Sequence, residues 1–229
     1  MPLELQGADN KSIKPSAFSF IKVIICDKGA WFLPHSVAPL SLAFGYPTVT
    51  EDLASMSATN TGRPDPNEYD PYYERYICLV HGQEIISELG QQLSETLALL
   101  RSVSEAKAEM RYAPGKWSLK EVGGHVLDFE RIFGYRALLI ARGELTPLPG
   151  CDQDELMRVA EFSRYRLSDL AAEFEQVRRA NISFFEHLGE EAWDRRGVAS
   201  EVEVSVRALA YIMAGHEAHH RRVIREKYL

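Results

Sequence analysis

The sequence predicts an all-α protein whose main part is a four-helix bundle. Four segments repeat apolar residues at the three- and four-residue spacing of an amphipathic helix. They cover roughly residues 82–105, 118–142, 167–188 and 204–228. No stretch alternates apolar and polar residues for long enough to build a sheet. Four long helices joined by connections that contain turn residues are typical of a four-helix bundle.

Length, composition and charge exclude several classes of protein. The chain has 229 residues and is 45 % hydrophobic, which suffices for a packed core. Its net charge of −7 argues against a nucleic-acid partner. No apolar run has the roughly 18 residues that span a membrane, so we expect no membrane partner. The three cysteines are widely spaced and form no CxxC motif, which favours the reducing cytoplasm.

The N-terminal part differs from the rest, and we expect residues 1–70 to be a poorly structured extension of a bundle formed by residues 71–229. Residues 1–55 contain scattered prolines and no helical or strand period longer than a few residues. A second interpretation is that Met56 is the true start and that the preceding residues are translated upstream sequence. The intact mass of the protein from its native host distinguishes the two, because a full-length mass contradicts the second.

Local signals mark where the long helices begin and end. Ser118 can cap the amide of Glu121, whose carboxylate can reach back to the amide of Ser118, and this reciprocal pair is a capping box. Trp117 and Val122 flank it at the positions of a hydrophobic staple. This second long helix should end near Gly143.

The second half of the chain carries similar signals. An acidic first turn predicts a short helix over residues 152–163. Gly189 should end the third long helix, and residues 190–203 form a polar connection. Ser205 can cap the last helix.

Histidines on two of these helices indicate a metal site. His216 and His220 are four residues apart, and apolar residues at helical spacing place them on the core face of the last helix. His125 lies on the apolar stripe of the second long helix. Three imidazoles from two neighbouring helices match a catalytic site with three protein ligands and one open position. Neutral imidazole suits zinc, nickel, iron or copper, and the residues do not choose among them. We expect zinc or nickel first, with iron or manganese as further candidates.

Other interpretations of these histidines remain open. His125 alone could be a core histidine with an ordinary hydrogen-bond partner, and the pair on the last helix could lie on its surface. His219 competes with His220 as the partner of His216, because residues three apart on a helix also meet. We prefer His220, since His219 shares its side of the helix with Arg222 and other polar residues.

Two carboxylates near the histidines have an uncertain role. Asp128 could orient the ring of His125 through a hydrogen bond, although a solvated helix carboxylate is the commoner case. Glu217 completes a formal HExxH motif with His216 and His220, but no sheet is expected that would position a peptide substrate. No general base is evident, and the catalytic residues are unknown at this stage.

Two motifs resemble a known family. The run from Trp117 to His125, followed by Asp128, is similar to the second helix of the DinB-like (DinB/YfiT) superfamily. The run from Gly215 to His220 is similar to its fourth helix, and the resemblance covers about residues 70–229. It implies a four-helix bundle, a homodimer, and one divalent metal ion bound by His125, His216 and His220.

The resemblance also implies a class of function. The family includes metal-dependent hydrolases and enzymes that use low-molecular-weight thiols, so we expect a metal-dependent enzyme acting on a small molecule, as a hydrolase or a thiol transferase. The chain departs from many members at Val223, where they carry glutamine. The alternative is a non-catalytic, metal-stabilised bundle that acts as a binding module. Tyr112, Trp117 and Trp193 are candidates for the walls of a substrate pocket.

Overall fold

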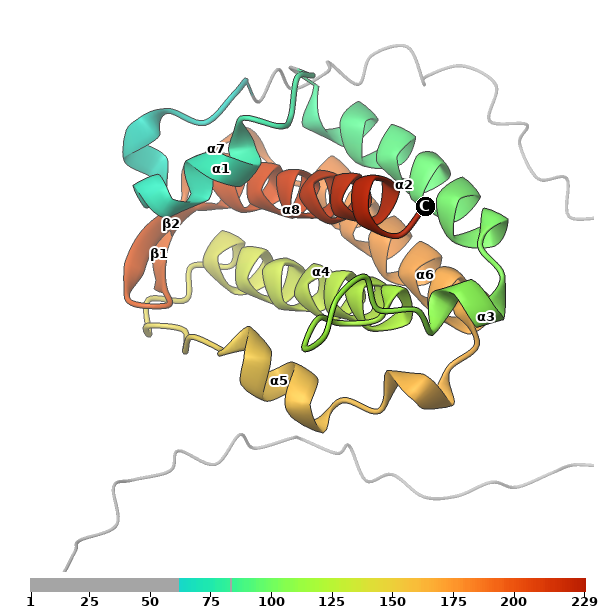
Figure 1. The fold of residues 1–229 in the computed structure, drawn as a ribbon. Coiled ribbons are helices and arrows are strands. Elements are labelled where there is room, and N and C mark those ends of the chain that lie inside the picture. Colours follow the sequence, from blue (N-terminus) through green and yellow to red (C-terminus); the bar gives the residue numbers. More distant parts are fainter. Residues whose placement is uncertain (1–61, 83) are drawn as a thin grey trace, which may run out of the picture. The chain divides into compact units, whose positions relative to one another are not determined.

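The computed structural model describes residues 62–82 and 84–229, and it confirms the all-α four-helix bundle (Figure 1). The expected extension up to residue 61, including Met56, lies outside the described residues. The four long helices are α2 (Ile85–Ser102), α4 (Leu119–Ala141), α6 (Leu167–Glu186) and α8 (Val206–Lys227).

Short helices fill the connections between the long ones. The α-helical ones are α1 (Glu74–Ile77), α3 (Glu105–Ala108), α5 (Gln153–Val159) and α7 (Glu190–Asp194). The 3-10 helices are η1 (Pro66–Glu68), η2 (Pro71–Tyr73) and η3 (Phe162–Arg164). The helix expected over 152–163 is therefore divided into α5 and η3, and the side chain of Asp152 caps α5.

The order in which the long helices pack brings distant parts of the chain together. Helix α4 packs against α6 and α8, and α2 packs against the same two helices from the other side. Among the described residues, α2 and α4 share no interface of similar size, so these two helices occupy opposite corners of the bundle. As a result α4 and α8, the two helices that carry the histidines, lie side by side.

The beginning of α4 follows the sequence signal. The hydroxyl of Ser118 accepts a hydrogen bond from the amide of Glu121, at 3.1 Å, and the carboxylate of Glu121 accepts one from the amide of Ser118, at 2.6 Å. Next to this cap, Tyr228 at the end of α8 donates its hydroxyl hydrogen to the carbonyl oxygen of Trp117, at 2.6 Å. These contacts fix the start of α4 against the end of α8.

A two-stranded hairpin occupies part of the segment expected to be a polar connection. Strand β1 (Arg196–Ala199) pairs antiparallel with β2 (Val202–Ser205). The expectation of no sheet is therefore wrong at this place. Each strand is only four residues long, and the turn residues Ser200 and Glu201 adopt positive φ angles of 55° and 66° without the glycine or asparagine that usually marks such a turn.

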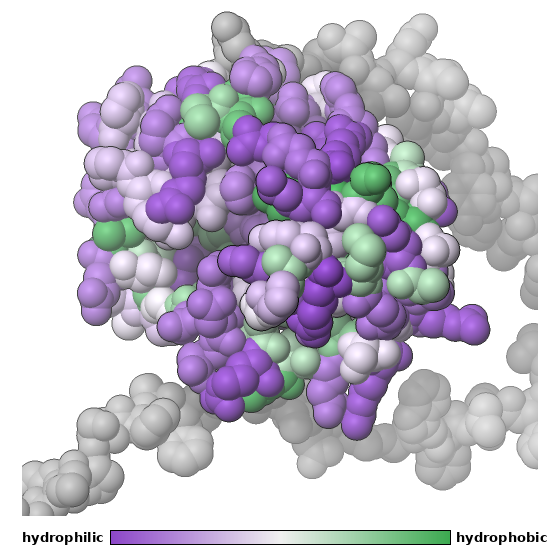
Figure 2. All heavy atoms as spheres, viewed as in Figure 1, coloured by the Kyte–Doolittle hydropathy of each residue, from purple (hydrophilic) through white to green (hydrophobic). Residues whose placement is uncertain are grey.

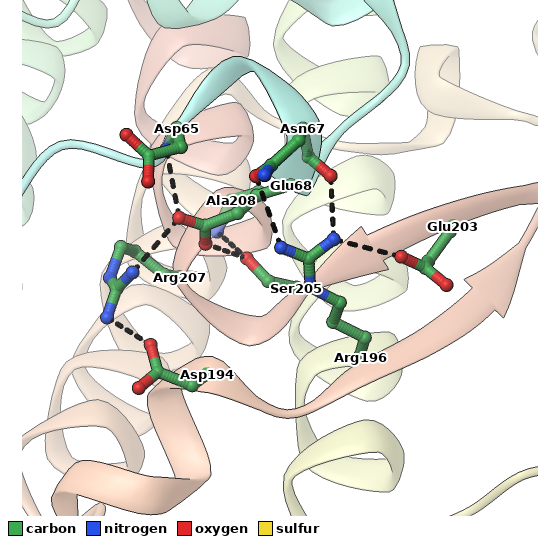
Figure 3. A network of polar contacts seen from close by, with 9 residues as sticks. All are labelled: Asp65, Asn67, Glu68, Asp194, Arg196, Glu203, Ser205, Arg207 and Ala208. Atoms are coloured by element: carbon green, nitrogen blue, oxygen red, sulfur yellow. Dashed lines mark hydrogen bonds and ion pairs between the residues drawn. The ribbon is translucent and has the colours of Figure 1, made fainter.

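The hairpin and the start of α8 hold the segment before α1 (Figure 3). The carboxylate of Glu68 is buried and accepts hydrogen bonds from the hydroxyl of Ser205, at 2.6 Å, and from the guanidinium of Arg207, at 3.0 Å. Arg196 of β1 donates to the backbone oxygen of Asn67, at 2.7 Å. Described residues just before position 70 therefore contact the bundle, and the boundary at residue 70 stays a prediction.

The interior consists of two hydrophobic clusters with polar residues between them. One cluster surrounds the hairpin end of the bundle, and the other surrounds α3, η3 and the C-terminal end of α8. Buried polar side chains from all four long helices lie at the intermediate positions, namely Gln92, Thr96, His125, Glu130, Arg178, His216 and Glu217. We call these seven residues the polar layer.

The face seen in Figure 2 is mostly hydrophilic. Hydrophilic residues cover most of this face, and the hydrophobic residues form small separate groups. Among the described residues, no helix combines the length and the hydropathy that a membrane span requires.

Candidate metal centre

Helices α4 and α8 bring three histidines together inside the polar layer. His125 of α4 and His216 of α8 are almost fully buried, with 1 % and 4 % of their surface exposed, and His220 is half-buried. The Nε2 atoms of His125 and His216 are 3.1 Å apart. One nitrogen from each of the three rings lies within 4.8 Å of the others. We call His125, His216 and His220 the histidine triad.

The spacing of the nitrogens fits a common metal ion. A tetrahedral zinc ion with bonds of about 2.0–2.1 Å holds its nitrogen ligands about 3.3 Å from one another. The separation of 3.1 Å between the Nε2 atoms of His125 and His216 is close to this value, and the third ring has a nitrogen within 4.8 Å of both. The donor set therefore fits a divalent ion that prefers imidazole.

Burial keeps the triad in the form that can bind a metal. Burial, with a smaller contribution from nearby histidines, lowers the pKa of His125 from 6.5 to about 4 and that of His220 to about 2. Burial also lowers the pKa of His216 well below its usual value, assisted by the other two rings of the triad. At neutral pH all three imidazoles are uncharged and have a free lone pair.

Aromatic side chains surround the triad. Trp117 and Phe129 contact the ring of His125, with ring centroids 4.9 and 4.6 Å away. Tyr76 of α1 contacts His216 in an edge-to-face arrangement at 5.4 Å. These rings restrict the rotation of the imidazoles and exclude solvent from one side of the triad.

Glycines next to two of the ligand positions permit this close packing. A side chain at Gly215 would collide with the backbone of Tyr76, so only glycine lets α1 approach α8 beside His216. A side chain at Gly124 would collide with the ring of Phe162. The glycines in the two sequence motifs therefore have a packing role.

The other histidines of the described residues do not belong to the triad. His219 projects beside the triad, where its ring packs against Tyr76 at 5.6 Å and against His220 at 5.0 Å. His81 and His187 are exposed, and His35 lies outside the described residues. The ring nitrogens that lie together are those of His125, His216 and His220, and the choice of His220 as a metal ligand stays a prediction.

Neither candidate carboxylate contacts the triad in the described residues. Asp128 is partly exposed and pairs with Arg131 at 3.8 Å, as a solvated helix carboxylate does. Glu217 is buried and points to α2, where its carboxylate accepts the hydroxyl hydrogen of Thr96. Burial raises the pKa of Glu217. Glu217 therefore does not act as the base of an HExxH motif.

Two hollows adjoin the triad. The larger, of about 480 Å³, is bordered by His220 and by residues of the loop before α4, among them Tyr112, Lys116 and Trp117. The smaller, of about 140 Å³, is bordered by His216, by tyrosines of η2 and α1, and by Arg136. Gln153 borders both. The triad can therefore be approached from two sides.

Two of the three residues expected to line a substrate pocket border a hollow, and the third does not. Tyr112 and Trp117 border the larger hollow, as does Val223. Trp193 is instead buried in the core, where it stacks on Phe185 with centroids 5.4 Å apart.

The sequence interpretation missed the residues that surround the smaller hollow. Tyr76 and Arg136 belong to it, and their roles depend on how α1 and the segment around residue 150 fold back on the bundle. The cluster of Tyr72, Tyr73 and Tyr76 is a visible signal in the sequence, but its spacing alone does not indicate what it packs against.

A helical bundle with three clustered histidines on two adjacent helices is typical of bundles that bind a metal ion in their core. The sequence profile of the DinB superfamily matches residues 88–224, and the chain belongs to this superfamily. Among solved structures it is similar to YfiT from Bacillus subtilis, with 16 % identity and a TM-score of 0.54 over 64 % of this chain and 89 % of that one. That protein is described as a probable metal-dependent hydrolase with an unusual four-helix bundle topology. No curated protein matches the chain.

Proposed function

We propose that this protein is a divalent-metal-dependent enzyme that acts on a small molecule. His125, His216 and His220 hold the ion, with zinc or nickel as the best candidates. The observation that carries the proposal is the histidine triad itself, in which three buried and uncharged imidazoles approach within 4.8 Å next to two hollows. A triad that served only packing has no need to adjoin two hollows.

The protein contributes position and environment to the chemistry. When bound, a divalent ion supplies Lewis-acid catalysis and acidifies water or a thiol. His125 and His216 are fixed by the aromatic rings around them, so they hold their nitrogens in place without rearrangement. His220 is more exposed and borders the larger hollow, so a substrate would reach the triad from its side.

The two hollows favour a reaction of two molecules. A polar molecule such as a low-molecular-weight thiol fits the larger hollow, where Lys116 and Asp154 offer charges of both signs. A second, more apolar molecule fits the smaller, largely aromatic hollow. Thiol transfer is the bimolecular form of this chemistry, and hydrolysis is the form in which water takes the place of the thiol.

Metal analysis tests the ligand assignment. The wild-type protein, purified without chelator, should contain about one divalent ion per chain, and His125→Ala and His216→Ala should each lose at least about nine-tenths of it. His219→Ala is the matched control, because this imidazole lies on the same helix outside the triad. A wild-type protein without metal, or a control that loses metal equally, contradicts the proposal.

A screen for activity separates an enzyme from a metal-stabilised binding module. Ester and amide hydrolysis and thiol transfer to electrophiles are measured with the metal-loaded and the metal-free protein. Activity that His220→Ala abolishes while the circular dichroism of the bundle is unchanged supports the enzyme. Metal content without activity in any of these reactions favours the binding module.

A further inference from the structure

Among the described residues, two arginines are buried in the bundle, and only one of them pairs with a carboxylate. Arg178 of α6 is fully buried, and its guanidinium donates to both carboxylate oxygens of Glu130, each at 2.8 Å. Arg136 of α4 has only 4 % of its surface exposed. Within the described residues it forms no ion pair, and its hydrogen bonds go to the neutral carbonyl oxygen of Pro149 and hydroxyl of Ser200, both at 2.9 Å.

An unpaired buried cation is costly to the fold. Burial of a charged group is unfavourable for folding when no group of opposite charge lies beside it. Both hydrogen bonds of Arg136 are made by Nη2, which leaves the donors on Nε and Nη1 without a partner among the described residues. The two neutral contacts hold the guanidinium in place but do not neutralise it.

Arg136 lies beside a hollow in which a ligand could pair with its charge. Arg136 borders the smaller hollow, whose other walls include Tyr73 and Tyr76 from η2 and α1 and Phe133 from α4. His216 of the triad borders the same hollow. The volume of about 140 Å³ is similar to that of a cavity of about 150 Å³ that holds one benzene molecule.

We propose that this hollow is a binding subsite for a small carboxylate with a flat apolar body, and that Arg136 binds the carboxylate. The proposal rests on the proposed function, because it places the second molecule of the reaction beside the triad. The aromatic walls bind the apolar body, and the carboxylate completes the charge pair that the fold leaves open. Arg136 is thus a residue that determines specificity, and it holds the substrate with its apolar body toward His216.

The test uses benzoate as the probe and benzamide as its neutral analogue, with binding measured by calorimetry. The metal-loaded wild type should bind benzoate, and Arg136→Gln should weaken this binding at least about tenfold. Benzamide should bind more weakly to the wild type and show little change in the variant. Arg131→Gln is the matched control, because Arg131 lies on the same helix but is exposed and pairs with Asp128 and Glu173.

A second arm separates this proposal from the proposed function. The metal-depleted His125→Ala variant should still bind benzoate, since the anchor is Arg136 and not the ion. Binding that disappears with the metal but resists Arg136→Gln overturns the subsite, whatever the activity screen shows. Phenyl phosphate serves as the competing anion, and tighter binding of phosphate than of carboxylate overturns the assigned chemistry.

A crystal structure covers the case in which Arg136→Gln does not fold. The wild-type protein is soaked with 4-bromobenzoate, and the anomalous signal of bromine locates the ligand. The proposal expects the carboxylate within hydrogen-bond distance of Arg136 and the ring between Tyr76 and Phe133. A ligand bound with its carboxylate away from Arg136 overturns it.

Discussion

Each histidine of the triad is held uncharged by its surroundings, and this links the stability of the metal-free protein to pH. The pKa of His125 is about 4 in the folded state against about 6.5 in an exposed state. Between these values the unfolded chain binds more protons, so stability rises with pH in this range. The contribution of this residue is fully present above about pH 6.5 and is lost as the pH falls toward 4.

A titration of stability measures this effect. Urea unfolding of the metal-free wild type should show a loss of about 2 kcal/mol from His125 alone between pH 7 and pH 5. The variant His125→Leu should be less sensitive to pH by about that amount, and His81→Phe at an exposed position controls for loss of an imidazole. An equal pH slope in His125→Leu and wild type contradicts the account.

At the scale of residues, periodicity located the triad but not its surroundings. His125, His216 and His220 stand on apolar stripes, and a helical period places such residues in the core whatever the topology. Arg136 is also buried, but an arginine on a helix is usually solvated and nothing near it in sequence marks it. Its hydrogen-bond partners, Pro149 and Ser200, lie 13 and 64 positions further along the chain.

At the scale of elements, the contact between α1 and α8 depends on one glycine. Gly215→Ala should destabilise the protein by about 1–3 kcal/mol, because the methyl group collides with the backbone of Tyr76 and displaces α1 from His216. Gly90→Ala is the matched control in α2, where the new methyl group meets no atom within 4 Å. It should stabilise the protein by about 0.5–1 kcal/mol through helix propensity.

Urea unfolding of both variants checks this prediction. Equal effects of the two substitutions would mean that α1 does not rest on α8 as described. A destabilised Gly215→Ala variant should also bind metal more weakly, since Tyr76 then no longer supports the ring of His216.

The elements differ in how well sequence reveals them. The start of α4 was confirmed in detail because a capping box involves residues only three positions apart. The hairpin was missed because its pairing is stabilised from outside. Leu148 donates its amide hydrogen to the carbonyl oxygen of Val198, and Arg196 donates to the backbone oxygen of Asn67. Such tertiary support leaves no period in a four-residue strand.

At the scale of the whole molecule, the polar layer joins all four long helices. Glu130 of α4 and Arg178 of α6 form its central pair, and Arg178 also donates to Gln92 of α2 at 3.3 Å. The pair is completely buried, so removal of one member leaves an uncompensated charge in the core. Glu130→Ala should therefore cost about 3–5 kcal/mol.

A double-mutant cycle isolates this pair. Arg178→Met alone should also destabilise strongly, whereas Glu130→Met combined with Arg178→Met should cost less than the sum of the single changes by about 2 kcal/mol or more. Strict additivity in urea unfolding would contradict a direct pair at the centre of the layer.

The bundle itself could be expected from four amphipathic segments, whereas the arrangement of the helices could not. Periodicity defines which face of each helix is buried but not which helix it meets, so the diagonal placement of α2 and α4 has no local signal. The polar layer could not be predicted either, because Glu130 and Arg178 look like ordinary charged residues of a helix surface in the sequence. The homodimer implied by the family resemblance stays a prediction.

X-ray absorption at the edge of the bound metal tests the central claim most directly. The wild-type protein should give a first shell with three imidazole nitrogens at about 2.0–2.1 Å if the ion is zinc, completed by oxygen ligands. The imidazole signal should be absent from metal added to His125→Ala in equal amount. A first shell that contains sulfur, or one without imidazole, would contradict a metal centre formed by His125, His216 and His220.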